Sequence, residues 1–246
     1  MASVARVLGY NSTVESIYTI NHPDVIKWTN NFHDKMNVGK IFEKFMTNLP
    51  RDISTSCVVA TGWHAFSMFM PQFLCQAAAM VSNNLARHYI VQGAFEELGM
   101  RDNTQIHPDL FWRAAESVEL SINNIVAAQN SLIHISLKSL RERLLSYKSD
   151  MQIFGVLLGL EIPAIENIET VFASMAYNEA TKLILEKNRF FIIHREIEFE
   201  HIRLTVSNFL RFQNSKQDID NFILGFMDGI QFWDDFWKGM KSYITW

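Results

Sequence analysis

The feature that most constrains this chain is a long stretch without a charged side chain. No Asp, Glu, Lys or Arg occurs from Ile53 to Ala86, so the segment must lie in a membrane or be covered by the rest of the protein. Polar residues such as Ser54, Thr61 and Gln72 interrupt the apolar run, and they argue against a transmembrane span. We therefore predict a helix that is buried on most sides inside a bundle.

Composition favours helices throughout. Glycine and proline, which helix interiors tolerate poorly, number only 10 and 5 in 246 residues. Hydrophobic residues make up 48% and charged residues 20%, which excludes a disordered chain. We find no strand-like alternation, repeat or linker. The sequence predicts one all-α domain over residues 1–246, a compact bundle of about seven helices.

Helical patterning and end signals predict the order of the elements. Asn21 and Pro23 suit the start of a first helix, and Gly99 suits the end of a second helix that bends near Pro71. The predicted helices cover about residues 21–45, 55–97, 107–129, 131–148, 154–161, 173–213 and 219–243.

Several functional classes are disfavoured by what the chain lacks. The net charge of −4 leaves no basic excess to neutralise nucleic-acid phosphates. The cysteines, Cys57 and Cys75, are too few for a disulfide framework or a Cys-rich zinc site. No phosphate loop, dinucleotide-binding glycine motif, Cys-x-x-Cys or Gly-x-Ser-x-Gly motif is present. The first residues lack the apolar core of a signal peptide, so we expect a cytoplasmic location.

The most informative segment is HREIEFEH, residues 194–201. In a helix, positions i, i+4 and i+7 lie within a narrow stripe, which here contains His194, Glu198 and His201. Two imidazoles and a carboxylate on one stripe suit a first-row transition metal. The alternative is a solvated polar face, although the preceding residues FFII favour burial.

Two further pieces carry the same residue types. Glu97 and His107 lie ten residues apart at a predicted helix end and the next helix start, with Glu96 offering an alternative register. Glu161 follows an apolar and glycine-containing run and would need a partner if buried. Alternatively, these are capping or surface residues. Together the pieces provide three carboxylates and three imidazoles, enough for two metals. Only one Glu-x-x-His motif is present, so a ferritin-type bundle fits poorly.

The runs FEELGMRDNTQIHPDLFW, LEIPAI and HREIEFEH together resemble the haem-oxygenase-like di-iron oxidases and oxygenases. This family shares a helical bundle with haem oxygenase and the TenA-type proteins, and the resemblance covers about residues 85–205. Many members have Asp where this chain has Glu198. Because the family's first ligand lies two residues before Gly99, the match selects Glu97 over Glu96. The implied ligands of two irons are Glu97, His107, Glu161, His194, Glu198 and His201.

The resemblance also implies an oxidoreductase that uses O2 as co-substrate, cycles between Fe2+ and Fe3+, and forms a peroxo-di-iron(III) intermediate. Members act on amino acids and fatty acids. No acid occurs between Ile53 and Phe95, which disfavours amine N-oxygenation in those members that use an extra carboxylate there. Residues 170–172 contain no Lys, which disfavours the members that consume their own side chain.

The expected substrate is an amino acid with a bulky apolar side chain, which would undergo oxidative cleavage, rearrangement, desaturation or nitrile formation. A fatty-acid oxidative decarboxylase, an amine N-oxygenase and a metal-free helical binding protein are the alternatives. Residues one or two turns from the ligands, together with the uncharged helix and a nearby cation, should line the pocket. The candidates are Ile90, Ala94, Phe191, Phe69 and Arg87. Further candidates are Met68, Phe73, Trp63 and Arg195.

The expected partner is a small-molecule substrate, with neither nucleic acid nor membrane involved. An external electron donor and a homodimer are both compatible with the resemblance.

Overall fold

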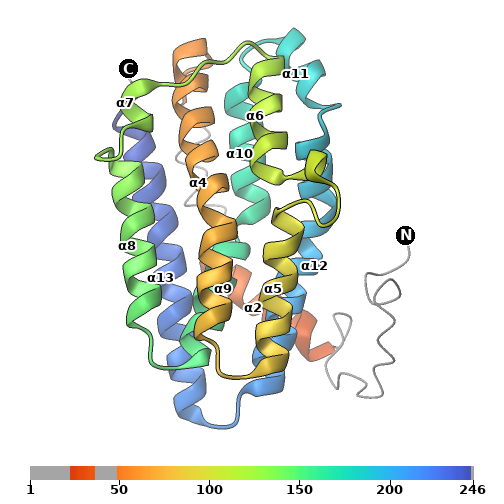
Figure 1. The fold of residues 1–246 in the computed structure, drawn as a ribbon, viewed down its shortest axis with the longest axis vertical. Coiled ribbons are helices and arrows are strands. Elements are labelled where there is room, and N and C mark those ends of the chain that lie inside the picture. Colours follow the sequence, from red (N-terminus) through yellow and green to blue (C-terminus); the bar gives the residue numbers. More distant parts are fainter. Residues whose placement is uncertain (1–22, 37–48, 245–246) are drawn as a thin grey trace.

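The computed structural model describes residues 23–36 and 49–244. In these residues every regular element is a helix, and nine helices have eleven residues or more, which confirms the predicted all-α fold. The helices run along the long axis of an elongated bundle (Figure 1). They are α2 (Pro23–Met36), α4 (Ile53–Met80), α5 (Asn84–Glu97), α6 (His107–Ser117), α7 (Asn124–Ala127), α8 (Leu132–Ser146), α9 (Asp150–Glu161), α10 (Ala164–Met175), α11 (Glu179–Leu185), α12 (Arg189–Phe212) and α13 (Lys216–Lys241), with a 3₁₀ turn at Asn103–Gln105.

The uncharged stretch forms α4, which contacts α5, α6, α8 and α10. Asp52 caps its start by accepting a hydrogen bond from the Thr55 amide at 2.7 Å. Most of its side chains are buried, including those of Val59 and Phe73. The predicted helix over residues 55–97 is wrong in one respect. The helix is continuous through Pro71, but it is not continuous to residue 97, because α4 ends at Met80 and the chain reverses at 81–83 into α5.

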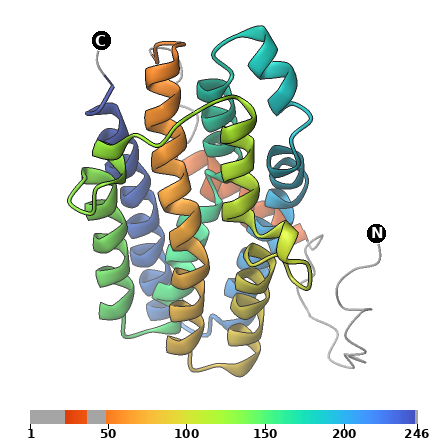
Figure 2. The ribbon, with the colours of Figure 1, turned by 45° about the horizontal axis from the view of Figure 1, so that its top comes forward.

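Helices α5 and α6 follow one another along the same side of the bundle, and α9 and α10 do the same (Figure 1, Figure 2). Gly99 and Met100, with φ of 77° and 56°, turn the chain sharply after α5. Pro163 separates α9 from α10. Both breaks fall near the middle of the bundle, so the residues beside them lie at a similar level along its long axis (Figure 1).

Two predicted helices prove to be too long. The helix predicted over residues 107–129 ends at Ser117, and Glu119 then has a φ of 59°. The helix predicted over residues 173–213 is divided among α10, α11 and α12, because the side chains of Asn178 and Asn188 cap new helix starts. In the first predicted helix, α2 begins at Pro23 as expected, and residues 37–45 lie outside the described residues.

Glycines bring α9 and α13 into backbone contact. A Cβ atom on Gly155 would collide with the carbonyl oxygen of Phe222, and one on Gly225 with that of Gln152. A Cβ atom on Gly229 would lie 2.7 Å from the carbonyl oxygen of Val156. This contact fixes α9, whose last residue is Glu161, against the longest helix of the C-terminal half.

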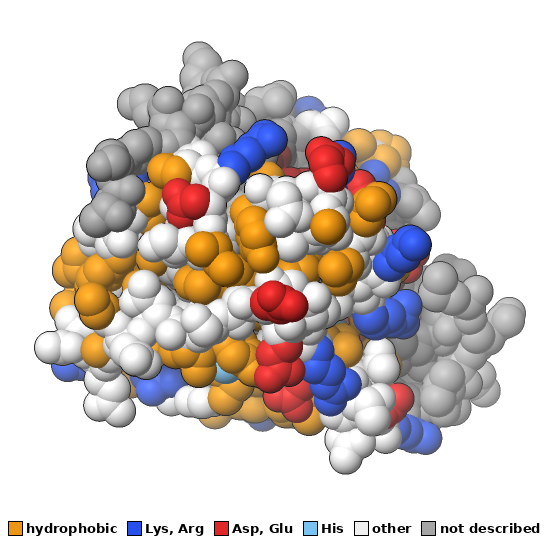
Figure 3. Space-filling view, turned by 90° about the horizontal axis from the view of Figure 1, so that it is seen from above, with side chains coloured by type: hydrophobic (Ala, Val, Ile, Leu, Met, Phe, Trp, Pro, Cys, Tyr) orange, Lys and Arg blue, Asp and Glu red, His pale blue; other side chains and the backbone are white. Residues whose placement is uncertain are grey.

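Residues 150–175 are long and apolar enough to cross a membrane by length and composition alone. The stretch comprises all of α9 and α10, and 72% of its most apolar window is buried within the protein, as in a core helix. At the end of the bundle seen from above, basic and acidic side chains are interspersed among apolar and polar ones (Figure 3). The cytoplasmic location and the absence of nucleic-acid partners stay predictions.

Replacing Gly155 by Ala should lower the free energy of unfolding by about 1–3 kcal/mol, because the added methyl group forces α9 away from α13. Gly93→Ala is the matched control. Its Cβ atom would meet only Leu74 Cδ1 at 3.9 Å, so better helix propensity should raise stability by ~0.5–1 kcal/mol. Denaturant unfolding followed by circular dichroism measures both. Equal effects of the two substitutions would contradict the close contact.

Candidate metal centre

All six predicted ligand residues lie around one cavity. They form two groups of three, and within each group the candidate ligand atoms lie within 4.8 Å of one another. The first group is Glu97, His107 and His194, and the second is Glu161, Glu198 and His201. Glu97 and His107 lie at the α5–α6 break, Glu161 at the end of α9, and the remaining three in α12.

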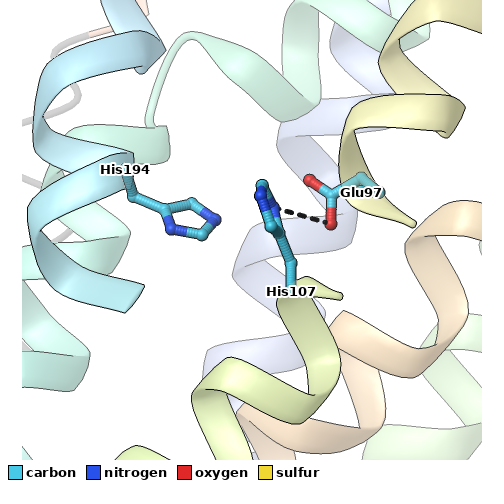
Figure 4. Close-up of side chains that lie close together, drawn as sticks. All are labelled: Glu97, His107 and His194. Atoms are coloured by element: carbon cyan, nitrogen blue, oxygen red, sulfur yellow. Dashed lines mark ion pairs between the residues drawn. The ribbon is translucent and has the colours of Figure 1, made fainter. Parts of the chain in front are cut away.

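In the first group, His107 Nδ1 lies 3.3 Å from Glu97 Oε2, and the His107 and His194 rings are 4.8 Å apart between centroids (Figure 4). His194 Nδ1 lies 2.8 Å from the carbonyl oxygen of Phe190. Since a carbonyl can only accept, the proton of His194 is on Nδ1, and Nε2 is left with a free lone pair for a metal.

In the second group, His201 Nδ1 lies 4.0 Å from Glu161 Oε2 and 3.9 Å from Glu198 Oε2. Its other nitrogen, Nε2, lies 3.1 Å from Glu96 Oε2. Helical spacing alone suggested that Glu96 would face outward if Glu97 faces the metals. The structure instead places Glu96 behind His201, where it can orient that ring with Nδ1 toward the other two carboxylates.

The stripe on α12 follows the predicted spacing. His194 and Glu198 are buried and His201 is half-buried, whereas Glu196 and Glu200 on the same helix are exposed. Helical geometry therefore separates two kinds of glutamate within seven residues, one facing the cavity and the other facing solvent.

The carboxylates of the centre differ in their acidity. Burial raises the pKa of Glu161, and the nearby Glu97 and Glu96 charges raise it further, outweighing the opposing effect of His201. Burial and the adjacent Glu161 charge raise the pKa of Glu198 well above its ordinary value. Burial also acts to raise the pKa of Glu97, but His107, His194 and His201 outweigh it and lower that pKa.

The two histidines of α12 shift in opposite directions. Burial and the neighbouring His107 lower the pKa of His194 to about 4, so this ring is neutral near pH 7. Burial also disfavours the charged form of His201, but the hydrogen bond to Glu96 and the charges of Glu161 and Glu198 raise its pKa to about 10. Without a metal, His201 is therefore the cation that offsets the carboxylates beside it.

The residues fit a pair of metal ions. His107 Nδ1 is buried and makes no hydrogen bond of good geometry, and three carboxylates converge on a space with apolar walls. Such a set is costly to bury without cations. Imidazole nitrogens with carboxylate oxygens are ligands that suit iron. The second group has one imidazole and two carboxylates, whereas the first has two imidazoles and one carboxylate. The second group therefore offers more negative charge to a metal ion.

The cavity is partly open and has about 60 Å³ of free space. A water molecule takes about 30 Å³ of liquid volume, so a ring-sized substrate requires the side chains of the wall to move. Apart from the six ligand residues, apolar side chains form most of its wall, among them Phe66, Met70, Leu160, Ile168, Phe190 and Trp233. Of the further candidates on the uncharged helix, Trp63 also lines the cavity. The exposed Met68 and the buried Phe73 are not among the described residues that line it.

The five residues predicted to bind substrate lie elsewhere. Ile90, Ala94, Phe69 and Phe191 are buried, but they are not among the described residues that line the cavity. Arg87 donates hydrogen bonds to the carbonyl oxygens of Ala78 and Val81, where it covers the end of α4. Phe190 takes the place expected for Phe191. It lies four residues before His194, so the helical period was a signal that pointed to it.

The fold and site together define an all-α protein with a buried histidine and carboxylate centre. A family model described as "Iron-containing redox enzyme", of the haem-oxygenase type, matches residues 64–234. The chain belongs to this family, as the sequence motifs predicted. No curated protein matches the chain.

Two crystal structures of a CADD-like protein of unknown function from Nostoc punctiforme have the same fold. The first is 14% identical, covers 90% of this chain and 95% of its own, and has a TM-score of 0.69. The second is also 14% identical, covers 86% and 99%, and has a TM-score of 0.61. At this identity the likeness concerns the fold alone.

Carboxylate-to-amide changes should separate the roles of Glu97, Glu96 and Glu200. Glu97→Gln should cost the protein one of its bound metals, because it removes a ligand charge at the first group. Glu96→Gln should weaken Fe(II) binding about tenfold by disturbing His201. Glu200→Gln, on the exposed face, should change nothing. Anaerobic Fe(II) titration followed by metal analysis measures all three. A larger effect of Glu96→Gln than of Glu97→Gln would reverse the assignment.

Metal binding should release protons. His201 is protonated near pH 7 in the metal-free protein, and a metal ligand must be deprotonated, so binding should expel about one proton from this ring. Affinity should therefore rise with pH. Calorimetric titration with a divalent metal in two buffers of different ionisation enthalpy measures the number released. A binding heat that does not depend on the buffer would contradict the raised pKa of His201.

Proposed function

We propose that this protein is a non-haem di-iron oxidase or oxygenase that uses O2 to oxidise a small organic substrate. One observation carries the proposal, namely the two facing groups of three His and Glu side chains around a single buried cavity. Membership of the iron-containing redox enzymes supports iron as the metal. A metal-free binding protein would have no use for three buried carboxylates beside three imidazoles.

In this proposal each group of three holds one iron. Two bound Fe(II) ions would supply electrons that activate O2, and O2 would be the oxidant of the substrate. The protein's own residues would hold the metal ions and orient the side chains that bind them. The Phe190 carbonyl fixes the tautomer of His194, Glu96 orients His201, and the apolar wall excludes water from the reacting space. An external electron donor would be required for outcomes that consume more electrons than the substrate provides.

The walls support a substrate with an aromatic or aliphatic body, such as an amino acid with a bulky apolar side chain. Neither Lys nor Arg is among the described residues that line the cavity. Arg195 forms an ion pair with Glu169 at 2.6 Å, and Arg87 is bonded to backbone carbonyls. A substrate carboxylate would therefore depend on neutral donors or on the metals.

The charge pattern favours fatty-acid oxidative decarboxylation as the second candidate. Outside the six ligand residues, the described lining offers no acid for the ammonium group of an amino acid. A fatty acid has no such group and needs only an apolar wall and a site for its carboxylate. Mass spectrometry of products from an amino-acid and fatty-acid panel, with Fe(II)-loaded protein and O2, discriminates between the two.

His194→Ala should abolish O2-dependent turnover and reduce bound iron from two to one per chain, with nearly unchanged helix content. His88→Ala, at an exposed position on α5, is the control and should keep both properties. Metal analysis after anaerobic loading, oxygen uptake and circular dichroism measure these effects. Full iron content and turnover in His194→Ala would refute the assignment.

A further inference from the structure

Two polar side chains that line the cavity, are not candidate metal ligands and make no hydrogen bond within the described part of the chain lie on α4. Among the described lining residues these are the indole of Trp63 and the hydroxyl of Ser67, one helical turn apart on the same face. The other indole, that of Trp233, already donates a hydrogen bond to the carbonyl oxygen of Leu160 at 3.1 Å. The two α4 side chains are therefore distinct from the rest of the wall.

The Trp63 N–H group has no acceptor. The side chain is 4% exposed, and its Nε1 atom is buried without a hydrogen-bond partner in the described part of the chain. A buried indole N–H nearly always has an acceptor, because leaving it unpaired costs free energy. The ring itself is held firmly, stacked on Trp233 at 5.8 Å with an angle of 15° between the planes. A rotation of the Trp63 ring toward an acceptor elsewhere in the protein would therefore have to break this stacking.

The hydroxyl of Ser67 also has no hydrogen-bond partner among the described residues, although its oxygen, unlike Trp63 Nε1, is not among the fully buried atoms. Other buried hydroxyls in helices donate to a backbone carbonyl, as Thr61 does to Cys57 at 2.7 Å and Ser174 to Thr170 at 2.8 Å. Ser67 is 6% exposed and makes no such bond to any described residue. Its hydroxyl therefore stays available as a second donor in the same cavity.

We propose that Trp63 and Ser67 form the polar subsite for the substrate, and that together they donate hydrogen bonds to one of its oxygen atoms. The proposal rests on the proposed function only in taking this cavity as the substrate site. The substrate is then an apolar body, packed against Phe66 and Trp233, that carries a carbonyl, carboxylate or hydroxyl oxygen. Because both donors are neutral, the subsite selects an acceptor by geometry and does not require a negative charge.

Binding of two probes of the same shape tests this assignment. Cyclohexanone carries a carbonyl oxygen where methylenecyclohexane carries a CH2 group, and neither is oxidised without iron. The wild-type protein, metal-free and under argon, should bind the ketone about three- to tenfold more tightly than the hydrocarbon. The indole ¹⁵N–H resonance of Trp63, assigned by its loss in Trp63→Phe, should move downfield with the ketone alone.

The ratio of the two affinities within each variant is the decisive quantity, because it is insensitive to a general loss of packing. It should decrease in Trp63→Phe and in Ser67→Ala, and it should fall to about one in the variant that carries both substitutions. It should persist in Trp112→Phe, which removes an indole on α6 that is not among the described residues lining the cavity. Equal affinities in the wild type, an unchanged ratio in Trp63→Phe, or no binding of either probe would overturn the assignment. In that case the Trp63 N–H group would donate to a water molecule and would not bind a substrate oxygen.

Cyclohexanecarboxylate in anaerobic Fe(II)-loaded protein forms the third arm. Binding that depends on Trp63 identifies the subsite as a carboxylate site, whereas ketone binding alone identifies a neutral oxygen. The outcome is separate from the fate of the proposed function. Protein that discriminates between the probes but binds no iron would retain the subsite and lose the di-iron assignment. Protein that binds two irons without discriminating would do the reverse.

Discussion

The structure depends on the mutual electrostatics of six titratable side chains, three buried and three half-buried, in the middle of an apolar bundle. Three carboxylates this close would repel one another strongly in a medium of low polarity, and the raised pKa values of Glu161 and Glu198 express that cost. In the metal-free protein a protonated His201 offsets part of it. Two divalent cations would offset more, which links the stability of this region to metal occupancy.

The interruptions of the helices are what bring these side chains to one level. Glu97 and His107 lie close together because the chain turns at Gly99 and α6 begins at His107. Glu161 ends α9 just before Pro163. An uninterrupted helix would carry each ligand on its own stripe but would spread them along the axis by 1.5 Å per residue. The glycine contact between α9 and α13 then fixes the depth of Glu161.

The sequence predicted the parts of the site that follow from helical period and failed where tertiary contacts decide. The stripe of α12 was predictable, since spacing alone aligns His194 with Glu198. Glu97 and Glu96 could be separated by resemblance, but not the contact of Glu96 with His201, which joins residues 105 positions apart. The pocket residues were misplaced for the same reason. Ala94 is small because it is packed in the core, and Arg87 is committed to the end of α4.

The absence of charge in α4 now has a physical reason beyond burial. This helix supplies none of the six ligand residues, yet Trp63, Phe66, Ser67 and Met70 present a continuous face to the cavity. A charged side chain on that face would interact with the metal ligands through a medium of low polarity, and would shift their pKa values or compete for the metals. Neutral donors avoid this conflict. An uncharged helix is therefore the arrangement that lets a wall recognise a substrate oxygen without disturbing the charge balance on the opposite side.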